Sequence, residues 1–165
     1  MKPQNILLDD SFTSRISDFG LAKLLRTDQT QTTTGIRGTR GYVATEWFKN
    51  TPITVKVDVY SYGILLLEII CCRNHFEEHA ENEDQMILAD WASGCYNQMK
   101  LHLLVENDHE AMNNITNVEK CMMIALSCIQ EDPTLRPTMK KVILKLEGIV
   151  EVSAPPDPSS FANST

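Results

Sequence analysis

The stretch from residue 55 to residue 72, VKVDVYSYGILLLEIICC, constrains the fold more than any other part of the chain. Its apolar residues fall on nearly every side of a helix, which excludes a surface helix with one wet face. A membrane span is disfavoured because Glu68 cuts the apolar run Gly63–Leu67 and Asp58 precedes it, whereas a span needs about 18 nearly uncharged residues. The pattern therefore predicts a buried central helix with Thr54 as its N-cap.

Three later segments carry apolar residues at the i, i+3, i+4, i+7 spacing of amphipathic helices: Leu88–Cys95, Val118–Ile129 and Met139–Leu146. Thr138 follows Pro137 and is expected to cap the third of these helices. We expect the three helices to cover the central one. With 165 residues the chain is long enough for one domain, which we place at residues 1–150. Residues 151–165 are rich in Pro and Ser, as is typical of a disordered tail.

The net charge of −7 is unevenly distributed along the chain. Residues 1–42 carry six Lys or Arg against four Asp or Glu (+2), and residues 43–165 carry nine against eighteen (−9). This balance argues against nucleic acid as a partner but allows a phosphate ligand near the N-terminal third. The five cysteines form no C-x-x-C pair and lie in apolar helical patterns, which indicates buried, reduced thiols in a cytosolic protein. No signal peptide or transmembrane segment is evident, so direct membrane insertion is not expected.

Near the N-terminus, two short apolar runs flank a polar turn, which predicts a small β-hairpin. Asn5 lies at the entrance of the hairpin and Asp18 at its exit, so the hairpin would bring an amide oxygen and a carboxylate together. Such oxygen ligands suit a hard cation such as Mg²⁺. Lys2, three residues before Asn5, could place an ammonium beside a phosphate bound to that metal. The alternative is that Asn and Asp are here only because they favour turns.

Residues 27–42, TDQTQTTTGIRGTRGY, contain six Thr and three Gly without an apolar pattern, which indicates an exposed loop. It is either an ordinary solvated loop or a switch segment in which Arg37 or Arg40 would hold a phosphorylated Thr.

Five acidic residues lie within residues 77–84, and this stretch most simply forms a solvated loop. The neighbouring residues 75–79, HFEEH, match the H-x-x-E-H pattern of one class of zinc peptidase. That chemistry needs both His on one face of a rigid helix and a third ligand. Because the stretch has almost no apolar face, a zinc site is disfavoured.

Together these pieces reproduce the second half of the protein-kinase signature set, in order and in spacing. The segments that carry the likeness are KPQNILLD, SDFGLAK, GTRGYVATEW, DVYSYGILLLEI and CIQEDPTLRPTM. The chain resembles the C-terminal lobe of a plant receptor-like serine/threonine kinase, and its ending LEGIVEVSAPPDP is similar to the lectin S-receptor-like branch. The resemblance implies a mainly α fold: a kinase-like C-terminal lobe with a buried central helix, covering helices and a small N-terminal β-hairpin.

The resemblance also implies roles for individual residues. Asn5 and Asp18 would bind the Mg²⁺ ions that bridge the phosphates of ATP, and Lys2 would contact the transferred phosphate. The Lys at this place implies Ser/Thr specificity. Asp58 would anchor the catalytic loop, and Glu46 would pair with Arg136, both structural roles. The candidate activation-loop phosphosites are Thr32, Thr33, Thr34 and Thr39.

The sequence departs from the family pattern in two ways. The family motif A-P-E is Ala44-Thr45-Glu46 here, and losing Pro removes a fixed φ. The catalytic Asp of H-R-D-x-x-x-x-N would fall five residues before Asn5, at position zero, and no Gly residues form a G-x-G loop. We therefore expect a kinase domain truncated at the catalytic loop, without its N-lobe and inactive by itself, with ATP and Mg²⁺ bound weakly or not at all.

Two hypotheses about function remain. One is a partial Ser/Thr kinase acting on a protein substrate, whose full-length relatives would be single-pass membrane receptors with this domain on the cytoplasmic side. The other is a non-catalytic binding or regulatory module that docks partner proteins.

Overall fold

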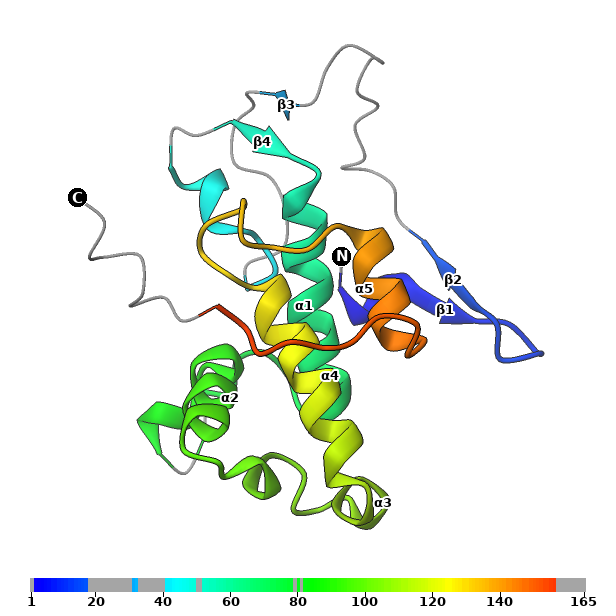
Figure 1. Cartoon of the computed structure of the whole chain (residues 1–165), viewed down its shortest axis with the longest axis vertical. Helices are drawn as coiled ribbons and strands as arrows, with labels where there is room; N and C mark the ends of the chain where they lie inside the picture. Colours follow the sequence, from blue (N-terminus) through cyan, green and yellow to red (C-terminus); the bar gives the residue numbers. More distant parts are fainter. Residues whose placement is uncertain are drawn as a thin grey trace.

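The computed structural model describes residues 2–17, 31–32, 41–49, 52–78, 80 and 82–156 (Figure 1). Helix α1, Lys56–Cys71, lies at the centre of the molecule, and its middle section Gly63–Glu68 is buried. The predicted central helix is therefore confirmed. Val55 rather than Thr54 occupies the N-cap position, but the Thr54 hydroxyl accepts a hydrogen bond from the backbone N–H of Lys56 at 3.2 Å. The N-cap therefore lies one residue later than predicted.

The three expected helices are present as α2, Leu88–Asn97; α4, Ile115–Cys128; and α5, Met139–Leu146, and a short helix α3, His109–Asn113, joins them. Helices α2 and α4 pack on α1 as expected, whereas α3 and α5 pack mainly on α4. Figure 1 shows α4 running beside α1, and the two helices form the main helix pair of the core. Thr138 caps α5 as predicted, with its hydroxyl accepting a hydrogen bond from the N–H of Lys141.

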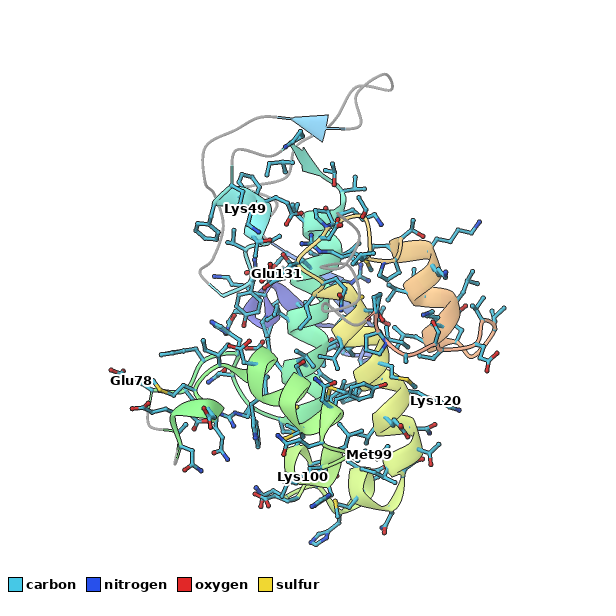
Figure 2. All side chains as sticks on the ribbon, turned by 60° about the vertical axis from the view of Figure 1, so that its left-hand side comes forward. Lys49, Glu78, Met99, Lys100, Lys120 and Glu131 are labelled. Atoms are coloured by element: carbon cyan, nitrogen blue, oxygen red, sulfur yellow. The ribbon has the colours of Figure 1, made fainter. Side chains whose placement is uncertain are left out.

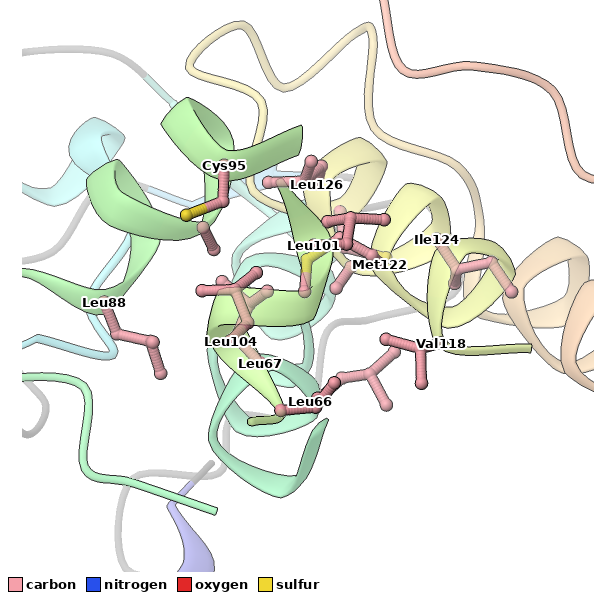
Figure 3. Close-up of a cluster of buried hydrophobic side chains, with 14 of the residues drawn as sticks. Leu66, Leu67, Leu88, Cys95, Leu101, Leu104, Val118, Met122, Ile124 and Leu126 are labelled. Atoms are coloured by element: carbon pink, nitrogen blue, oxygen red, sulfur yellow. The ribbon is translucent and has the colours of Figure 1, made fainter. Parts of the chain in front are cut away.

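The core lies where α1, α2 and α4 converge (Figure 3). Leu67, Leu88 and Met122 are almost completely buried there, one from each helix. Leu101 and Leu104 close one side from the 3₁₀ helix Leu101–Leu104. Covering the middle of α1 in this way removes its apolar side chains from water, which is the main stabilising contribution to the fold.

Gly63 of α1 lies against the C-terminal end of α4. A methyl group placed on Gly63 would lie 2.6 Å from Cγ2 of Ile129 and 2.7 Å from Cβ of Cys128. Real Cβ atoms are not found at such distances, so the helix contact requires glycine here. Gly94 in α2 is the opposite case, because a methyl group there would meet nothing within 4 Å.

The predicted hairpin is present. Strand β1, Ile6–Leu8, pairs antiparallel with β2, Ser14–Ile16, in the register Ile6 to Ile16. The Asp9 carboxylate accepts hydrogen bonds from the backbone N–H groups of Ser11 and Thr13, which shapes the turn. A second pair joins β3, Gln31–Thr32, to β4, Ile53–Thr54. The remaining short elements are the 3₁₀ helices Pro3–Asn5, Thr45–Trp47 and Glu83–Gln85.

Residues 151–156, which the sequence analysis assigned to a disordered tail, have no helix or strand, yet Val152 packs against the hydrophobic core. Figure 1 shows this red segment turning back from the end of α5. None of the described helices is both long and apolar enough to cross a membrane.

The five cysteines are all free thiols, as expected from their spacing. Burial raises the pKa of Cys128 to about 12 and that of Cys71 to about 12, so both stay protonated near neutral pH. Cys72 is exposed, which differs from the buried position that its sequence pattern indicated, because it is the C-cap of α1 with φ at 50°.

Candidate functional site

The 3₁₀ helix Pro3–Asn5 and the hairpin hold two of the three residues predicted to bind Mg²⁺ and phosphate. The N–H of Asn5 donates to the carbonyl of Lys2 at 3.0 Å, so one tight turn joins these residues. The carbonyl of Asn5 accepts hydrogen bonds from the N–H of Ser17 at 2.7 Å and from its hydroxyl at 3.2 Å. The chain at the exit of β2 therefore lies against the entrance of β1.

Asp18 lies outside the described residues, so the predicted metal pair of Asn5 and Asp18 stays a prediction. The residues that are described fit the implied ligands in their chemistry, because an amide oxygen is a ligand for Mg²⁺ and an ammonium suits a phosphate. Among the described residues, no group of three or more His, Cys, Asp or Glu side chains could hold a metal ion.

The phosphosites predicted in the Thr-rich loop fall largely outside the described residues, which is the case for Thr33, Thr34 and Thr39. Thr32 is in β3, where its backbone pairs with that of Ile53 in β4. Asp58, expected to anchor a catalytic loop, is exposed in the first turn of α1, and its carboxylate makes no ion pair or hydrogen bond with another described residue.

Glu46 and Arg136 form a buried, bidentate ion pair. Nη1 and Nη2 of Arg136 donate to the two carboxylate oxygens of Glu46, each at 2.7 Å. Arg136 is 1% exposed and Glu46 is 3% exposed. The guanidinium also donates to the carbonyl oxygens of Gln130, Lys56 and Glu131 and stacks 5.0 Å from the ring centre of Tyr60. The pair implied by the resemblance is thus present, and it ties the helix Thr45–Trp47 to α1 and to the loop before α5.

The environment of Glu46 affects its ionisation in two opposing ways. Burial by itself raises the pKa of this carboxyl, but the hydrogen bonds and charge of Arg136 outweigh burial and hold the pKa below its usual value of 4.5. Glu46 is therefore ionised at neutral pH.

A second polar cluster, around Glu68, was missed by the sequence analysis. The Tyr42 hydroxyl donates to the Glu68 carboxylate at 2.7–2.8 Å, and the backbone N–H of His75 donates to it at 2.6 Å. Nδ1 of His75 lies 3.1 Å from the same carboxylate, and Ser61 donates to the carbonyl of Tyr42 at 2.7 Å. Burial and the neighbouring carboxylate raise the pKa of Tyr42 well above its usual value. The sequence did carry a signal for this cluster: a carboxylate in the apolar middle of a buried helix must find polar partners, because an unpaired buried charge is very costly.

We predict that Tyr42→Phe lowers the free energy of unfolding by about 1.5–3 kcal/mol, because it removes a hydrogen bond to a buried carboxylate. Urea unfolding followed by circular dichroism measures the change. Tyr96→Phe is the matched control, since the hydroxyl of Tyr96 donates no hydrogen bond to a described residue, and we expect a change within about 0.5 kcal/mol. Equal losses in the two variants would show that the Tyr42 hydroxyl contributes nothing through Glu68.

The zinc hypothesis receives no support from the geometry. His75 lies just before the β-bridge residue Phe76 rather than on a helix, and its ring faces Glu68 in the cluster just described. His79 lies outside the described residues.

A cavity of about 490 Å³ lies between the segment Gly41–Val43, α1 and the start of α2. Its lining is mostly apolar, with the phenol of Tyr60 and the imidazole of His75 as polar groups. Gly41, with φ at 90°, makes the close contact at one wall, because a methyl group there would lie 2.1 Å from the ring of His75. No pattern in the sequence indicated this cavity.

Comparison with known proteins places these features in context. The sequence matches the model of the protein kinase domain over residues 1–145. It is 59% identical over 164 residues to the G-type lectin S-receptor-like serine/threonine-protein kinase LECRK2 of Oryza sativa subsp. japonica. It is 60% identical over 164 residues to LECRK4 of Oryza sativa subsp. indica and 54% identical over 165 residues to RLK1 of Arabidopsis thaliana, both named in the same way. The alignments cover 99–100% of this chain but only 19–20% of each relative, so the chain spans about one fifth of their length.

Proposed function

This chain belongs to the protein kinase family, and from that premise we propose that it carries part of the phosphate- and metal-binding side of a receptor-like Ser/Thr kinase. The observation that carries the proposal is the hairpin, whose hydrogen bonds from Ser17 to the Asn5 carbonyl hold its two ends together. Asp18 is the next residue in the chain after Ser17, so the same hydrogen bonds support its placement near Asn5.

In this proposal Asn5 offers its amide oxygen and Asp18 its carboxylate to Mg²⁺, while Lys2 places its ammonium beside the phosphate to be transferred. When bound, Mg-ATP supplies the phosphoryl group, and its metal ions neutralise the charge on the phosphates. The ion pair of Glu46 and Arg136 holds the segment before α1 in place for a protein substrate. Phosphorylation of Thr32, Thr33, Thr34 or Thr39 would modulate that segment, and a cytoplasmic location beneath a membrane receptor follows by analogy with the relatives.

We predict that the isolated 165 residues do not phosphorylate protein. Phosphoryl transfer depends on positioning and charge stabilisation, and these residues contain neither a Gly-rich loop nor an Asp five positions before Asn5. The test incubates the purified chain with labelled ATP, Mg²⁺ and a generic Ser/Thr substrate, and calorimetry of Mg-ATP binding accompanies it. We expect no turnover and a dissociation constant no tighter than about 1 mM, because exposed charge pairs each contribute only about 0–1 kcal/mol.

Asp18→Ala is the control for both measurements. Turnover, or micromolar binding, that disappears in Asp18→Ala would contradict the prediction of inactivity and would show that these residues form a working nucleotide site. Turnover that persists in Asp18→Ala would instead indicate a contaminating kinase.

The second candidate function is a non-catalytic module that binds partner proteins. The cavity beside α1 favours this second function. Its volume of about 490 Å³ falls within the roughly 300–1,000 Å³ of ordinary ligand sites, and its lining residues include none of the proposed nucleotide-binding residues.

A further inference from the structure

Thr45 stands where the family motif A-P-E has its Pro, so this chain carries a hydroxyl that the family pattern lacks. The residue is half-buried and begins the 3₁₀ helix Thr45–Trp47. This helix lies at the surface, because Phe48 directly after it is 65% exposed and Lys49 is exposed as well. Unlike Pro, a Thr at the surface can be modified on its side-chain oxygen.

The Thr45 hydroxyl lies against the buried ion pair of Glu46 and Arg136. Its Oγ1 is 3.4 Å from Oε2 of Glu46 and 3.4 Å from the carbonyl oxygen of Glu131. Nη2 of Arg136 donates to these same two oxygens, at 2.7 and 3.2 Å. The hydroxyl and the guanidinium therefore share both acceptors, and a group attached to Oγ1 would lie directly beside the ion pair.

The hydroxyl itself contributes little to this arrangement. Both of its distances exceed the range of about 2.5–3.0 Å that is usual for a hydroxyl donor, and its one hydrogen serves only one acceptor at a time. Glu46 depends instead on the two N–H groups of Arg136, which reach it at 2.7 Å each. Replacing the hydroxyl should therefore cost little, whereas a group that brings charge to Oγ1 acts on the ion pair.

A phosphate on Oγ1 would oppose the ion pair strongly. Phosphothreonine carries a charge of about −1.5 to −2 at neutral pH, and its oxygens accept hydrogen bonds, as do the carboxylate of Glu46 and the carbonyl of Glu131. Like charges would repel Glu46, and the phosphate would compete with it for Arg136. The exposed ammonium of Lys49 already pairs with the Glu131 carboxylate at 3.8 Å, and Figure 2 labels both residues.

We propose that Thr45 is a phosphorylation site, and that its phosphate opens the ion pair of Glu46 and Arg136 and frees residues 41–49 from the loop before α5. A receptor-like Ser/Thr kinase acting on this chain supplies the phosphoryl group from Mg-ATP. Any effect of the opening on a protein substrate rests on the proposed function, whereas the opening itself does not.

The chemical step is an ordinary phosphoryl transfer. The oxygen of the Thr45 hydroxyl forms a bond to the γ-phosphorus of ATP, and the bond from that phosphorus to the oxygen it shares with the β-phosphate breaks. ADP leaves with the electron pair of the broken bond, and the hydroxyl proton passes to the carboxylate base of the acting kinase.

The first experiment asks whether Thr45 is modified. The 165-residue chain is incubated with Mg-ATP and the kinase domain of LECRK4 of Oryza sativa subsp. indica, and phosphopeptides are assigned by mass spectrometry. We expect phosphate on Thr45, and its loss from the corresponding peptide of Thr45→Val. Because the acting kinase supplies the nucleotide site, the result does not depend on whether this chain binds Mg-ATP. Absence of phosphate from Thr45 would overturn the proposal.

The second experiment measures what the phosphate does. Phosphothreonine is incorporated at position 45, and amide hydrogen exchange is followed at Trp47 and Phe48, whose N–H groups donate to the carbonyls of Ala44 and Thr45 at 3.1 and 3.0 Å. We expect exchange at least tenfold faster than in the unmodified chain, because opening the ion pair removes the support of this helix. The amides of α4 should keep their protection, which would show that the chain stays folded.

Three controls separate the ion pair from other effects of the modification. Phosphothreonine at Thr116 adds the same charge at an exposed position, at the opposite end of α4 from the loop that holds Arg136. The double variant Glu46→Leu, Arg136→Met, with phosphothreonine at position 45, has no ion pair to open. Thr45→Val removes the hydroxyl without adding charge. In each case the modification should change exchange at the two amides less than threefold.

Four outcomes of the second experiment would overturn the proposal: exchange that phosphate at position 45 leaves unchanged or slows, an equal increase with phosphate at Thr116, the same increase in the double variant, or an equal increase in Thr45→Val. Slower exchange would show that the phosphate binds Arg136 and holds the segment more firmly in place.

Discussion

Arg136→Ala should lower the free energy of unfolding by about 3–5 kcal/mol, because it leaves the carboxylate of Glu46 buried without its counter-charge. A domain of this kind has only about 5–15 kcal/mol of stability in total, so the variant should be largely destabilised or unfolded at 25 °C. Urea unfolding monitored by circular dichroism measures the change. The bidentate geometry and the three backbone carbonyls that Arg136 also binds are the reason for so large an effect.

Two variants serve as controls for this prediction. Lys49→Ala breaks the pair of Lys49 with Glu131, which is long at 3.8 Å and exposed to solvent, and should change stability by no more than about 1 kcal/mol (Figure 2). The double variant Glu46→Leu, Arg136→Met removes both charges and should recover much of the loss, because apolar replacements of a buried pair are often close to neutral. A loss of less than 1 kcal/mol in Arg136→Ala would contradict the prediction.

The same pair predicts a dependence of stability on pH. The pKa of Glu46 is lower in the folded chain than its ordinary value of 4.5. The contribution of Glu46 to the free energy of unfolding is therefore fully present above pH 4.5. It is lost as the pH falls through the pKa that Glu46 has in the folded chain, because the protonated carboxyl no longer pairs with Arg136. Acid unfolding of the double variant should lack this component, which comparison of the two pH profiles would reveal.

Replacing Gly63 with Ala should destabilise the chain, and replacing it with Val should do so more strongly. The added methyl group would meet Ile129 and Cys128 at distances that force α1 and α4 apart. Overpacking of this kind costs about 1–3 kcal/mol and occasionally more, which exceeds the gain of up to about 1 kcal/mol that Ala brings to a helix. Thermal or urea unfolding measures the net effect.

Gly94→Ala is the matched control, because it makes the same chemical change in a helix with open space around the added methyl group. We expect it to raise the free energy of unfolding by about 0.5–1 kcal/mol through helix propensity alone. Opposite signs at Gly63 and Gly94 would establish that the α1–α4 contact sets the cost. The same sign at both positions would contradict this explanation.

Much of the architecture was predictable because it is encoded locally. The apolar residues around Leu67 predicted the buried helix, the spacing from Leu88 to Cys95 predicted α2, and Thr138 predicted the start of α5. In each case the periodicity or the capping residue lies within a few positions of the structure that it specifies. The hairpin of β1 and β2 was accessible for the same reason, since turn residues between two apolar runs favour it.

The candidate site was predicted in two ways. The hairpin pattern and the family motifs both placed Lys2, Asn5 and Asp18 together, whereas the pairing of Glu46 with Arg136, 90 positions apart, was implied only by the resemblance. No local pattern in these residues indicates that pairing. Likewise, the cavity is lined by residues from four separate segments of the chain, so no single stretch of sequence indicates it.

Glu68 marks the boundary between what the sequence determined and what only the tertiary structure decided. The sequence alone determined that this carboxylate lies in a helix too apolar to be anywhere but the interior. Only the folded chain decided its partners, Tyr42 from 26 positions before it and His75 from 7 positions after it. The spacing of apolar residues specifies which side chains are buried, because this spacing is a property of the helix itself. The groups that satisfy a buried charge depend on which distant segments converge on it, and that is settled only when the core packs.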